Sequence, residues 1–236
     1  GMTGTLDGSK THKLVLEGLF GTVNKVISTK ELIEKKTLAN LKIDSLILGY
    51  KEQECKDVKD LKYADEMDYI VTHKKRLSFI TNLLGNVKGN VLVLYQFVEK
   101  HGKPLYDTIK EKYKNRNVFF VSGSVDALDR EKIREISEKT NNAVIVASYG
   151  TFSTGINIKN LHNIIFSSPS KSKIRVLQSI GRGLRLNDNK EMCKLFDIAD
   201  DLTYKGKQNF TLRHFMERIN IYNEEQFDYT IHRINI

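Results

Sequence analysis

Gln178-Ser-Ile-Gly-Arg-Gly-Leu-Arg185 is the stretch around which the rest of this chain is organised. Read as a helix, Gln178, Arg182 and Arg185 fall at positions i, i+4 and i+7, which places two guanidiniums and one carboxamide on one face. Arginine is always charged and its planar fork matches phosphate oxygens, so this face suits a triphosphate. Gly181 and Gly183 each cost about 1 kcal/mol relative to alanine inside a helix. A close approach by a ligand or by a second domain would offset that cost. The alternative is a basic helix end with glycines near its C-cap.

Length and composition are those of an ordinary globular protein with an anionic partner. The 236 residues are enough for one or two domains with a substantial core, and 40% apolar with 28% charged residues is a typical balance. The net charge of +9 favours nucleic acid as the partner. The sequence shows neither a long apolar run nor an apolar signal segment, so we expect no membrane contact and a cytoplasmic location.

Cysteine and histidine positions argue against a structural metal. Cys55 and Cys193 are far apart and neither lies in a C-x-x-C, and the six histidines show no metal-ligand spacing. We therefore expect two reduced thiols and no metal site within this chain.

Strands and helices alternate along most of the sequence. Val91–Phe97 is a nearly continuous apolar run, as expected of a parallel strand buried on both faces. Helical spacing predicts one helix over Tyr69–Leu84, and Asp126 is a suitable N-cap for a helix over Ala127–Lys139. Further strands are predicted over 41–50, 117–121, 143–147, 163–166 and 192–198, further helices over 14–20, 105–113 and 209–229, a short strand over 23–27, and irregular segments over 28–40 and 51–62. This alternation predicts an α/β fold with a doubly wound parallel sheet and a C-terminal helix.

Two of the predicted strands end in small polar residues. Val121-Ser-Gly-Ser124 precedes Asp129-Arg130, which reads as a strand, a turn and a helix start. Val146-Ala-Ser-Tyr-Gly-Thr-Phe-Ser-Thr-Gly-Ile-Asn157 places a hydroxyl at the carboxyl end of a strand, just before a helix start. Such a position offers N–H and O–H donors to phosphate oxygens.

These stretches resemble, in order, four motifs of superfamily 2 helicases. Met2-Thr-Gly-Thr-Leu6 resembles motif III, the strand at Val91 motif IV, the stretch ending at Asn157 motif V, and Gln178–Arg185 motif VI, Q-x-x-G-R-x-x-R. Over its whole length the chain resembles the C-terminal half of a bacteriophage helicase of this superfamily. The resemblance implies a RecA-like lobe of an ATP-driven enzyme for recombination and repair, acting on branched or forked DNA or on RNA–DNA hybrids.

The resemblance also implies roles for single residues. Arg182 and Arg185 would stabilise charge on the γ-phosphate of ATP, and Gln178 would position that phosphate or the attacking water. Asn157 stands where many relatives have aspartate, and the spacing from Ser148 to Gly155 is one residue longer than in the commonest subfamily. Implied nucleotide contacts are Gly155, Asn157 and Gly181; implied contacts to nucleic-acid phosphates are Ser122, Gly123, Arg130, Ser148, Ser153 and Thr154.

The sequence holds no complete phosphate-binding loop. Gly4–Thr11 nearly matches G-x-x-x-x-G-K-[ST], but Ser9 stands where glycine is needed. Phosphoryl transfer needs that loop and acids that hold Mg²⁺, so we expect ATP and Mg²⁺ to be bound mainly by a separate first lobe. We predict a first-lobe remnant and connector over 1–40, the second RecA-like lobe over 41–205 and a helical extension over 206–236. A catalytically silent nucleic-acid-binding module of the same fold is the alternative.

Overall fold

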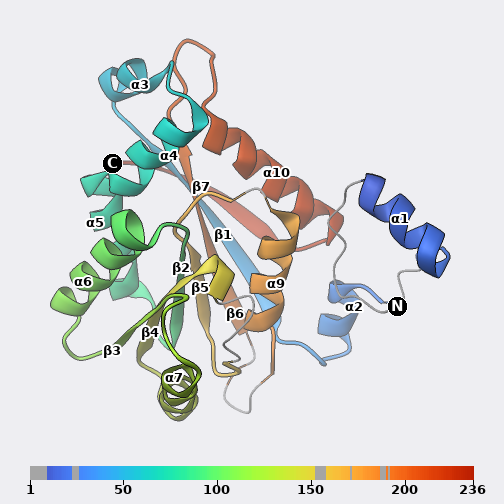
Figure 1. Ribbon diagram of the computed structural model, residues 1–236. Helices are drawn as coiled ribbons and strands as arrows, with labels where there is room; N and C mark the ends of the chain where they lie inside the picture. The colour runs from blue at the N-terminus through green and yellow to red at the C-terminus, as the bar shows by residue number, and fades with distance from the viewer. Residues whose placement is uncertain (1–9, 23–26, 152–157, 171, 187–189, 191) are drawn as a thin grey trace.

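The fold is a single parallel sheet with helices on both faces, as the sequence predicts (Figure 1). The computed structural model describes residues 10–22, 27–151, 158–170, 172–186, 190 and 192–236. Its seven strands lie in the order β3-β4-β2-β5-β6-β1-β7 and all pair in parallel. They are β1 (Asn40–Gly49), β2 (Val91–Tyr95), β3 (Asn117–Val121), β4 (Ala143–Ser148), β5 (Asn163–Phe166), β6 (Met192–Asp201) and β7 (Tyr229–Asn235).

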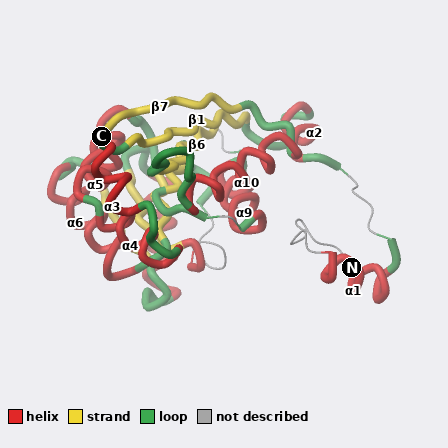
Figure 2. Tube along the Cα trace, turned by 90° about the horizontal axis from the view of Figure 1, so that it is seen from above, coloured by secondary structure: helices red, strands yellow, loops and turns green. Residues whose placement is uncertain are grey.

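The helices form two layers that bury opposite faces of the sheet. They are α1 (Lys10–Phe20), α2 (Thr29–Glu34), α3 (Glu52–Val58), α4 (Tyr63–Thr72), α5 (Lys74–Leu83), α6 (Lys103–Lys112), α7 (Ala127–Lys139), α9 (Lys173–Gly183) and α10 (Phe210–Glu224), with short turns η1 (Leu84–Asn86) and η2 (Val98–Gly102). Leu92 and Leu94 of β2 belong to the core under α7, α9 and α10, whereas Val91 and Val93 belong to the core under α5 and α6. This alternation explains why β2 is apolar at every position. Figure 2 shows α9 and α10 together on one side of the sheet.

Two segments that were predicted to be irregular contain helices. Lys51–Lys62 was expected to be a loop, but α3 occupies its middle and buries Cys55 while its charged residues remain outside. The predicted connector over 28–40 contains α2, which begins with a capping box: the Ser28 hydroxyl accepts from Glu31 N, and the Glu31 carboxylate accepts from Ser28 N. Such reciprocal bonds satisfy donors that a helix start would otherwise leave unpaired.

The helix predicted over Tyr69–Leu84 is in fact two helices. The backbone of His73 is extended, with φ −69° and ψ 117°, which ends α4. The same residue caps α5, because its ring accepts a hydrogen bond from Arg76 N at 3.3 Å. The apolar spacing continues across this break, so the pattern alone gives no sign of it.

The C-terminal segment is not one helix as predicted. The helix α10 ends at Glu224, and Gln226 adopts a left-handed φ of 57°. The chain then forms β7, which pairs in parallel with β1 from Ile43↔Tyr229 to Gly49↔Asn235. Residues 206–236 therefore supply the seventh strand and, through Phe215 and Tyr222 of α10, part of the main core.

The predicted helix near the N-terminus is present as α1, and its apolar side chains Leu14, Leu19 and Phe20 are exposed. The strand predicted over 23–27 and the motif at Met2–Leu6 lie outside the described residues, except for Ile27. Within the described part of the chain, no helix has the length and apolar character needed to cross a membrane.

Candidate functional site

Helix α9 carries the arginine-rich motif on its outward face. Val176 and Ile180 are buried against the sheet, while Gln178 is exposed and Arg182 is half-buried one turn later. Arg185 lies beyond the end of the helix, so the expected position i+7 on one helical face is wrong for it. Arg185 still follows directly after the C-cap Leu184. Burial and then the positive charge of Arg185 lower the pKa of Arg182. Guanidiniums are suited to bind the oxygens of a phosphate or carboxylate in pairs.

The two glycines of the motif have different surroundings. A Cβ built on Gly181 meets no atom within 4 Å, whereas one built on Gly183 would lie 2.5 Å from Ile164 Cδ1 and 2.8 Å from Cys193 Sγ. Gly183 therefore lets the end of α9 approach the sheet closely. Gly181 is exposed and has open space where a side chain would be. Among the described residues, no close contact therefore offsets the free-energy cost of a glycine inside this helix.

A buried lysine fixes the turn that carries Arg185. The ammonium of Lys190 donates to the carbonyl oxygens of Gly183 at 2.5 Å, Arg185 at 2.8 Å and Lys159 at 3.2 Å. Burial lowers the pKa of this ammonium. A cation among the last carbonyls of a helix is favourable because it opposes the negative end of the helix dipole. The sequence analysis did not single out Lys190, and no local pattern marks it.

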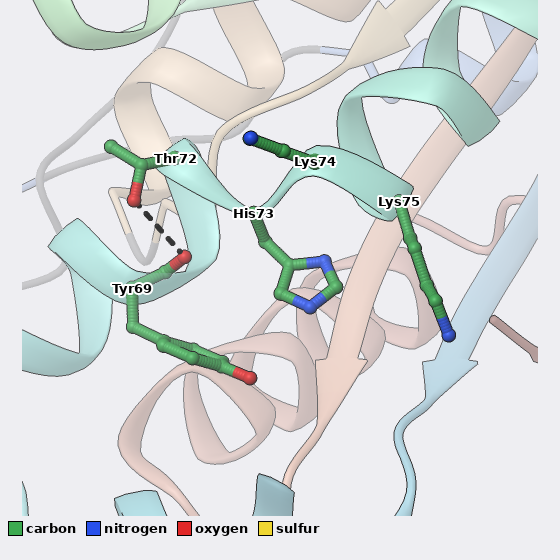
Figure 3. Close-up of a pocket in the computed structure, with 5 residues that line it drawn as sticks. All are labelled: Tyr69, Thr72, His73, Lys74 and Lys75. Carbon is green, nitrogen blue, oxygen red and sulfur yellow. Dashed lines mark hydrogen bonds between the residues drawn. The ribbon is translucent and has the colours of Figure 1, made fainter.

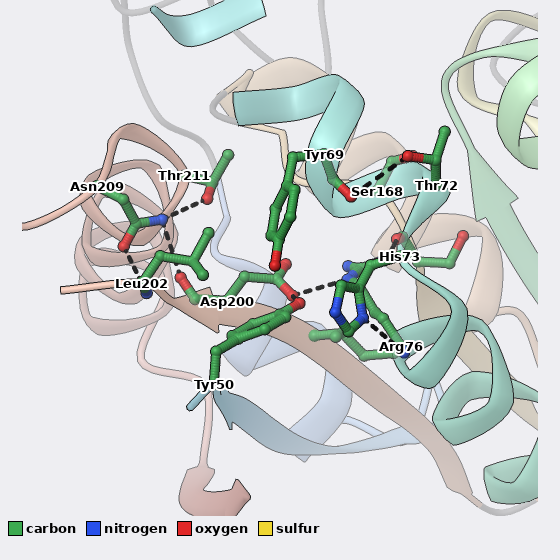
Figure 4. Close-up of polar contacts among 12 residues, drawn as sticks. Tyr50, Tyr69, Thr72, His73, Arg76, Ser168, Asp200, Leu202, Asn209 and Thr211 are labelled. Carbon is green, nitrogen blue, oxygen red and sulfur yellow. Dashed lines mark hydrogen bonds and ion pairs between the residues drawn. The ribbon is translucent and has the colours of Figure 1, made fainter. Parts of the chain in front are cut away.

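The loop that leads into α9 is held by two buried ion pairs. Arg76 of α5 donates to Asp200 at 2.7 Å and to the carbonyl of Ser167 at 2.8 Å. Arg218 of α10 bonds both carboxylate oxygens of Asp197 and donates to the carbonyl of Ser170 at 2.8 Å. Figure 4 shows Arg76 and Asp200 meeting beside Tyr50, whose hydroxyl donates to the same carboxylate at 2.7 Å.

Ser168, in the same loop, is hydrogen-bonded to three residues from other parts of the chain. Its hydroxyl accepts from Gln96 N at 3.1 Å and lies 2.8 Å from His101 Nδ1, and its carbonyl accepts from the Tyr149 hydroxyl at 3.1 Å. Burial, followed by the charge of Arg76, lowers the pKa of His101 to about 3. This imidazole is therefore neutral over the ordinary pH range.

The predicted phosphate contacts lie at the carboxyl ends of β3 and β4. Gly123 is exposed with open space where a side chain would be, and the Arg130 guanidinium reaches back to its carbonyl at 3.4 Å. Ser122 is buried and its hydroxyl bonds that of Ser124 at 2.7 Å. The hydroxyl of Ser148 accepts from Thr151 N at 3.1 Å and so caps the turn after β4. Of the predicted contacts at these strand ends, Gly123 is exposed, Arg130 and Ser148 are half-buried and Ser122 is buried.

Four predicted site residues, Ser153, Thr154, Gly155 and Asn157, lie outside the described residues. In the parts of the chain that the structure describes, no group of three or more His, Cys, Asp or Glu side chains could hold a metal ion. A cavity of about 350 Å³ at the break between α4 and α5 contains none of the predicted residues (Figure 3). It is lined by Tyr69, Thr72, His73, Lys74 and Lys75.

Comparisons with known proteins show what this chain is similar to. Residues 75–187 match the helicase conserved C-terminal domain. The whole chain is 34% identical over 249 aligned positions to the ATP-dependent DNA helicase uvsW of Enterobacteria phage T4, and it spans 49% of that protein. The crystal structure of T4 UvsW matches with a TM-score of 0.72 and 36% identity over 84% of this chain and 42% of that one. These findings confirm the predicted likeness to the C-terminal half of a phage helicase.

A DNA-bound structure shares the fold. The ATP-dependent Type ISP restriction-modification enzyme LlaBIII bound to DNA matches with a TM-score of 0.61, covering 93% of this chain and 17% of that one. Its sequence identity is 16%, so this likeness concerns the fold alone.

The glycines of α9 provide a first test by thermal or denaturant unfolding of the chain. Gly181→Ala should raise the free energy of unfolding by up to about 1 kcal/mol, because the helix gains alanine without a clash. Gly183→Ala should lower it by about 1–3 kcal/mol, because the new methyl overpacks against Ile164 and Cys193. Equal effects of the two substitutions would contradict this account of the helix end.

The buried imidazole provides a test by pH. The unfolded chain binds a proton at His101 near pH 6.5, but the folded chain does so only near pH 3. The contribution of the neutral imidazole to the free energy of unfolding is therefore fully present above about pH 6.5. It is lost as pH falls, by up to about 1.4 kcal/mol per pH unit. In His101→Gln this contribution should vanish from denaturant-derived stabilities between pH 7 and 5.

The control for this experiment is Leu128→Gln, which changes a 75% exposed side chain of α7 and removes no titratable group. It should keep the wild-type pH slope. If His101→Gln also keeps that slope, then the imidazole is not held neutral by the fold.

Proposed function

We propose that this chain is the second RecA-like half of a helicase that acts on branched or forked DNA or on RNA–DNA hybrids. The premise is that residues 75–187 match the helicase conserved C-terminal domain and that the whole chain is similar to an ATP-dependent DNA helicase. The observation that carries the proposal is that α9 presents Gln178 and Arg182 on its outward face and that Arg185 follows directly after the C-cap. Because the chain spans about half of the phage relative, the other half would supply the remaining groups of the site.

In this proposal the two arginines stabilise negative charge on the γ-phosphate of ATP. When bound, ATP supplies the phosphoryl group and Mg²⁺ neutralises part of its charge. The fit is chemical: guanidiniums match phosphate oxygens in charge and geometry. Gln178, on the same outward face of α9, would orient the phosphate or the attacking water. Gly181, Gly155 and Asn157 would lie against the nucleotide.

In this proposal Lys190 positions the backbone that carries the arginines, and the first lobe binds the metal. Lys190 bonds the backbone carbonyls of Gly183 and Arg185, on both sides of Leu184, so the backbone of this turn needs little ordering when an anion arrives. The described residues offer no carboxylate cluster for Mg²⁺. The first lobe would therefore hold the metal together with the phosphates.

The nucleic acid would run along the carboxyl edge of the sheet. Gly123 allows a sugar–phosphate backbone to approach, and Arg130 beside it supplies charge. Ser122, Ser148, Ser153 and Thr154 would add backbone N–H and hydroxyl donors. These are contacts to phosphates, so we expect affinity without sequence preference and with steep salt dependence.

Joining this chain to the N-terminal half of T4 UvsW tests the proposed catalytic role. The chain alone should show no ATP hydrolysis above background, because the phosphate-binding lysine and metal acids come from the other half. The joined protein should hydrolyse ATP in a DNA-stimulated manner. Arg182→Ala or Arg185→Ala should then lower kcat by about 10³-fold or more, as for other arginines that stabilise a phosphoryl-transfer transition state.

The matched control is Arg134→Ala, which removes an exposed arginine of α7 that pairs with Glu131. It should leave kcat unchanged. If the joined protein binds DNA but loses nothing with Arg185→Ala, then the chain is the catalytically silent nucleic-acid-binding module. ATP hydrolysis by the chain alone would contradict both readings.

A further inference from the structure

A cavity of about 280 Å³ lies just past the carboxyl end of β6, at the start of α4 and α10. The two helices pack against each other and lie side by side in Figure 1. The side chains around the cavity combine basic and aromatic character, and none of them belongs to a helicase motif quoted above. The lining includes Lys59, Lys62, Lys207, Phe210 and Arg213.

One aromatic ring, that of Phe210, lines this cavity, and the ring of Tyr63 packs against it. Tyr63 is 39% exposed and Phe210 36% exposed. Their ring centroids lie 6.1 Å apart at 68°, so each ring supports the other edge to face. The Arg213 guanidinium lies 4.5 Å from the centroid of Phe210. Such supported rings, with part of their surface open to water, are suited to stacking against a planar group.

The charges around the rings are predominantly positive. The lining contains four cationic side chains and two carboxylates. The cations are Lys59, Lys62, Lys207 and Arg213, and the carboxylates are Asp60 and Glu66. Asp60 pairs with Lys207 at 3.0 Å. Glu66 is occupied by the start of α10, where its oxygens accept from Phe210 N at 2.9 Å and Thr211 N at 2.7 Å. The carboxylate that lies deepest therefore stabilises a helix end and does not oppose an incoming anion.

The composition of this surface favours nucleic acid over protein as its partner. Lysine is depleted in protein–protein interfaces, whereas three of the four cations here are lysines. Basic residues interleaved with aromatic rings are typical of surfaces that bind single strands, where each ring stacks on a base and the cations follow the phosphates.

The position of the cavity agrees with such a partner. It lies at the same edge of the sheet as Gly123 and Ser148, because all strands are parallel. The end of β3 is level with Asp197 of β6, four strand spacings or about 19 Å away, and β6 continues for four more residues, or about 13 Å. A strand that crosses the carboxyl edge from Gly123 would reach the rings after only a few nucleotides.

We propose that Tyr63 and Phe210, flanked by Lys62, Lys207 and Arg213, form a stacking site for an unpaired base of single-stranded nucleic acid. This inference rests on the proposed function and extends its nucleic-acid path from the ends of β3 and β4 to α4 and α10. The rings contact the base through its face, so the site accepts any base. The cations contact the neighbouring phosphates.

Binding of a labelled oligo(dT) of 15 nucleotides to the 236-residue chain tests the proposal. Phe210→Ala and Tyr63→Ala should each weaken binding by about 5- to 140-fold, the loss expected for one stacked base. The salt dependence should stay unchanged in both, because no charge is removed. Lys62→Ala should weaken binding and reduce the log–log salt slope by about 0.7, the value for one phosphate contact on a single strand.

The control is Met216→Ala, which removes a 49% exposed apolar side chain of α10 outside the cavity lining. Phe210→Tyr should retain binding, and thermal unfolding of each variant should show that the fold is intact. Polyglutamate serves as a second probe: its binding should not respond to Phe210→Ala, because it has no base to stack. If the two ring variants bind oligo(dT) as Met216→Ala does, then the stacking site is refuted.

Arg130→Ala separates this inference from the proposed function. If Arg130→Ala weakens binding while the ring variants do not, the path over β3 stands and the stacking site falls. If the ring variants weaken binding and Arg130→Ala does not, the stacking site stands and the path over β3 is wrong. If the unaltered chain binds no oligo(dT) at low salt, both are wrong.

Discussion

Two aspartates at the carboxyl end of β6 determine how the layers of this protein are joined. Asp197 and Asp200 are completely buried and lie three residues apart on one strand, so they face opposite sides of the sheet. Each meets a buried arginine from the helix layer on its own side: Arg218 of α10 and Arg76 of α5. Removing one partner from such a pair costs about 3–5 kcal/mol, because the other charge remains buried without compensation. Both helix layers are therefore tied to the same central strand.

The same two arginines also determine where α9 begins. Each donates a further hydrogen bond to the loop between β5 and α9, Arg76 to Ser167 and Arg218 to Ser170. At the other end of the helix, Gly183 packs directly on the sheet and Lys190 bonds the final carbonyls. A helix held at both ends can present Arg182 with little loss of side-chain and backbone entropy on binding an anion. The position of α9 therefore depends on Arg76, Arg218 and Lys190 as well as on the eight residues of the motif.

Strands and helices that a clear local pattern marks could be predicted from the sequence. The strands β3 and β5 and the helix α7, with its cap at Asp126, have the predicted bounds. Strand β7 was missed because it is an edge strand with most of its side chains exposed, so it lacks an apolar pattern. The break at His73 and the position of Arg185 depend on single backbone conformations that do not alter the spacing of apolar residues. Lys190 could not be found from the sequence because its three acceptors are backbone carbonyls, which carry no side-chain identity.

The topology gives α9 a particular place between the two proposed sites. Its first turn follows β5 and so lies at the carboxyl edge, where the nucleic acid would run. Its last residue precedes Leu184, whose carbonyl accepts from Ala39 N at the start of β1, and so the arginines lie at the opposite edge. The eleven residues between span about 16 Å. A displacement of the loop at Ser167–Ser170 would therefore reach Arg182 through one rigid element that is packed on the sheet and held at each end. A flexible segment of this length would not transmit such a displacement. The hydrogen bonds and packing contacts at the two ends of α9 would therefore allow the binding of nucleic acid and of nucleotide to affect one another.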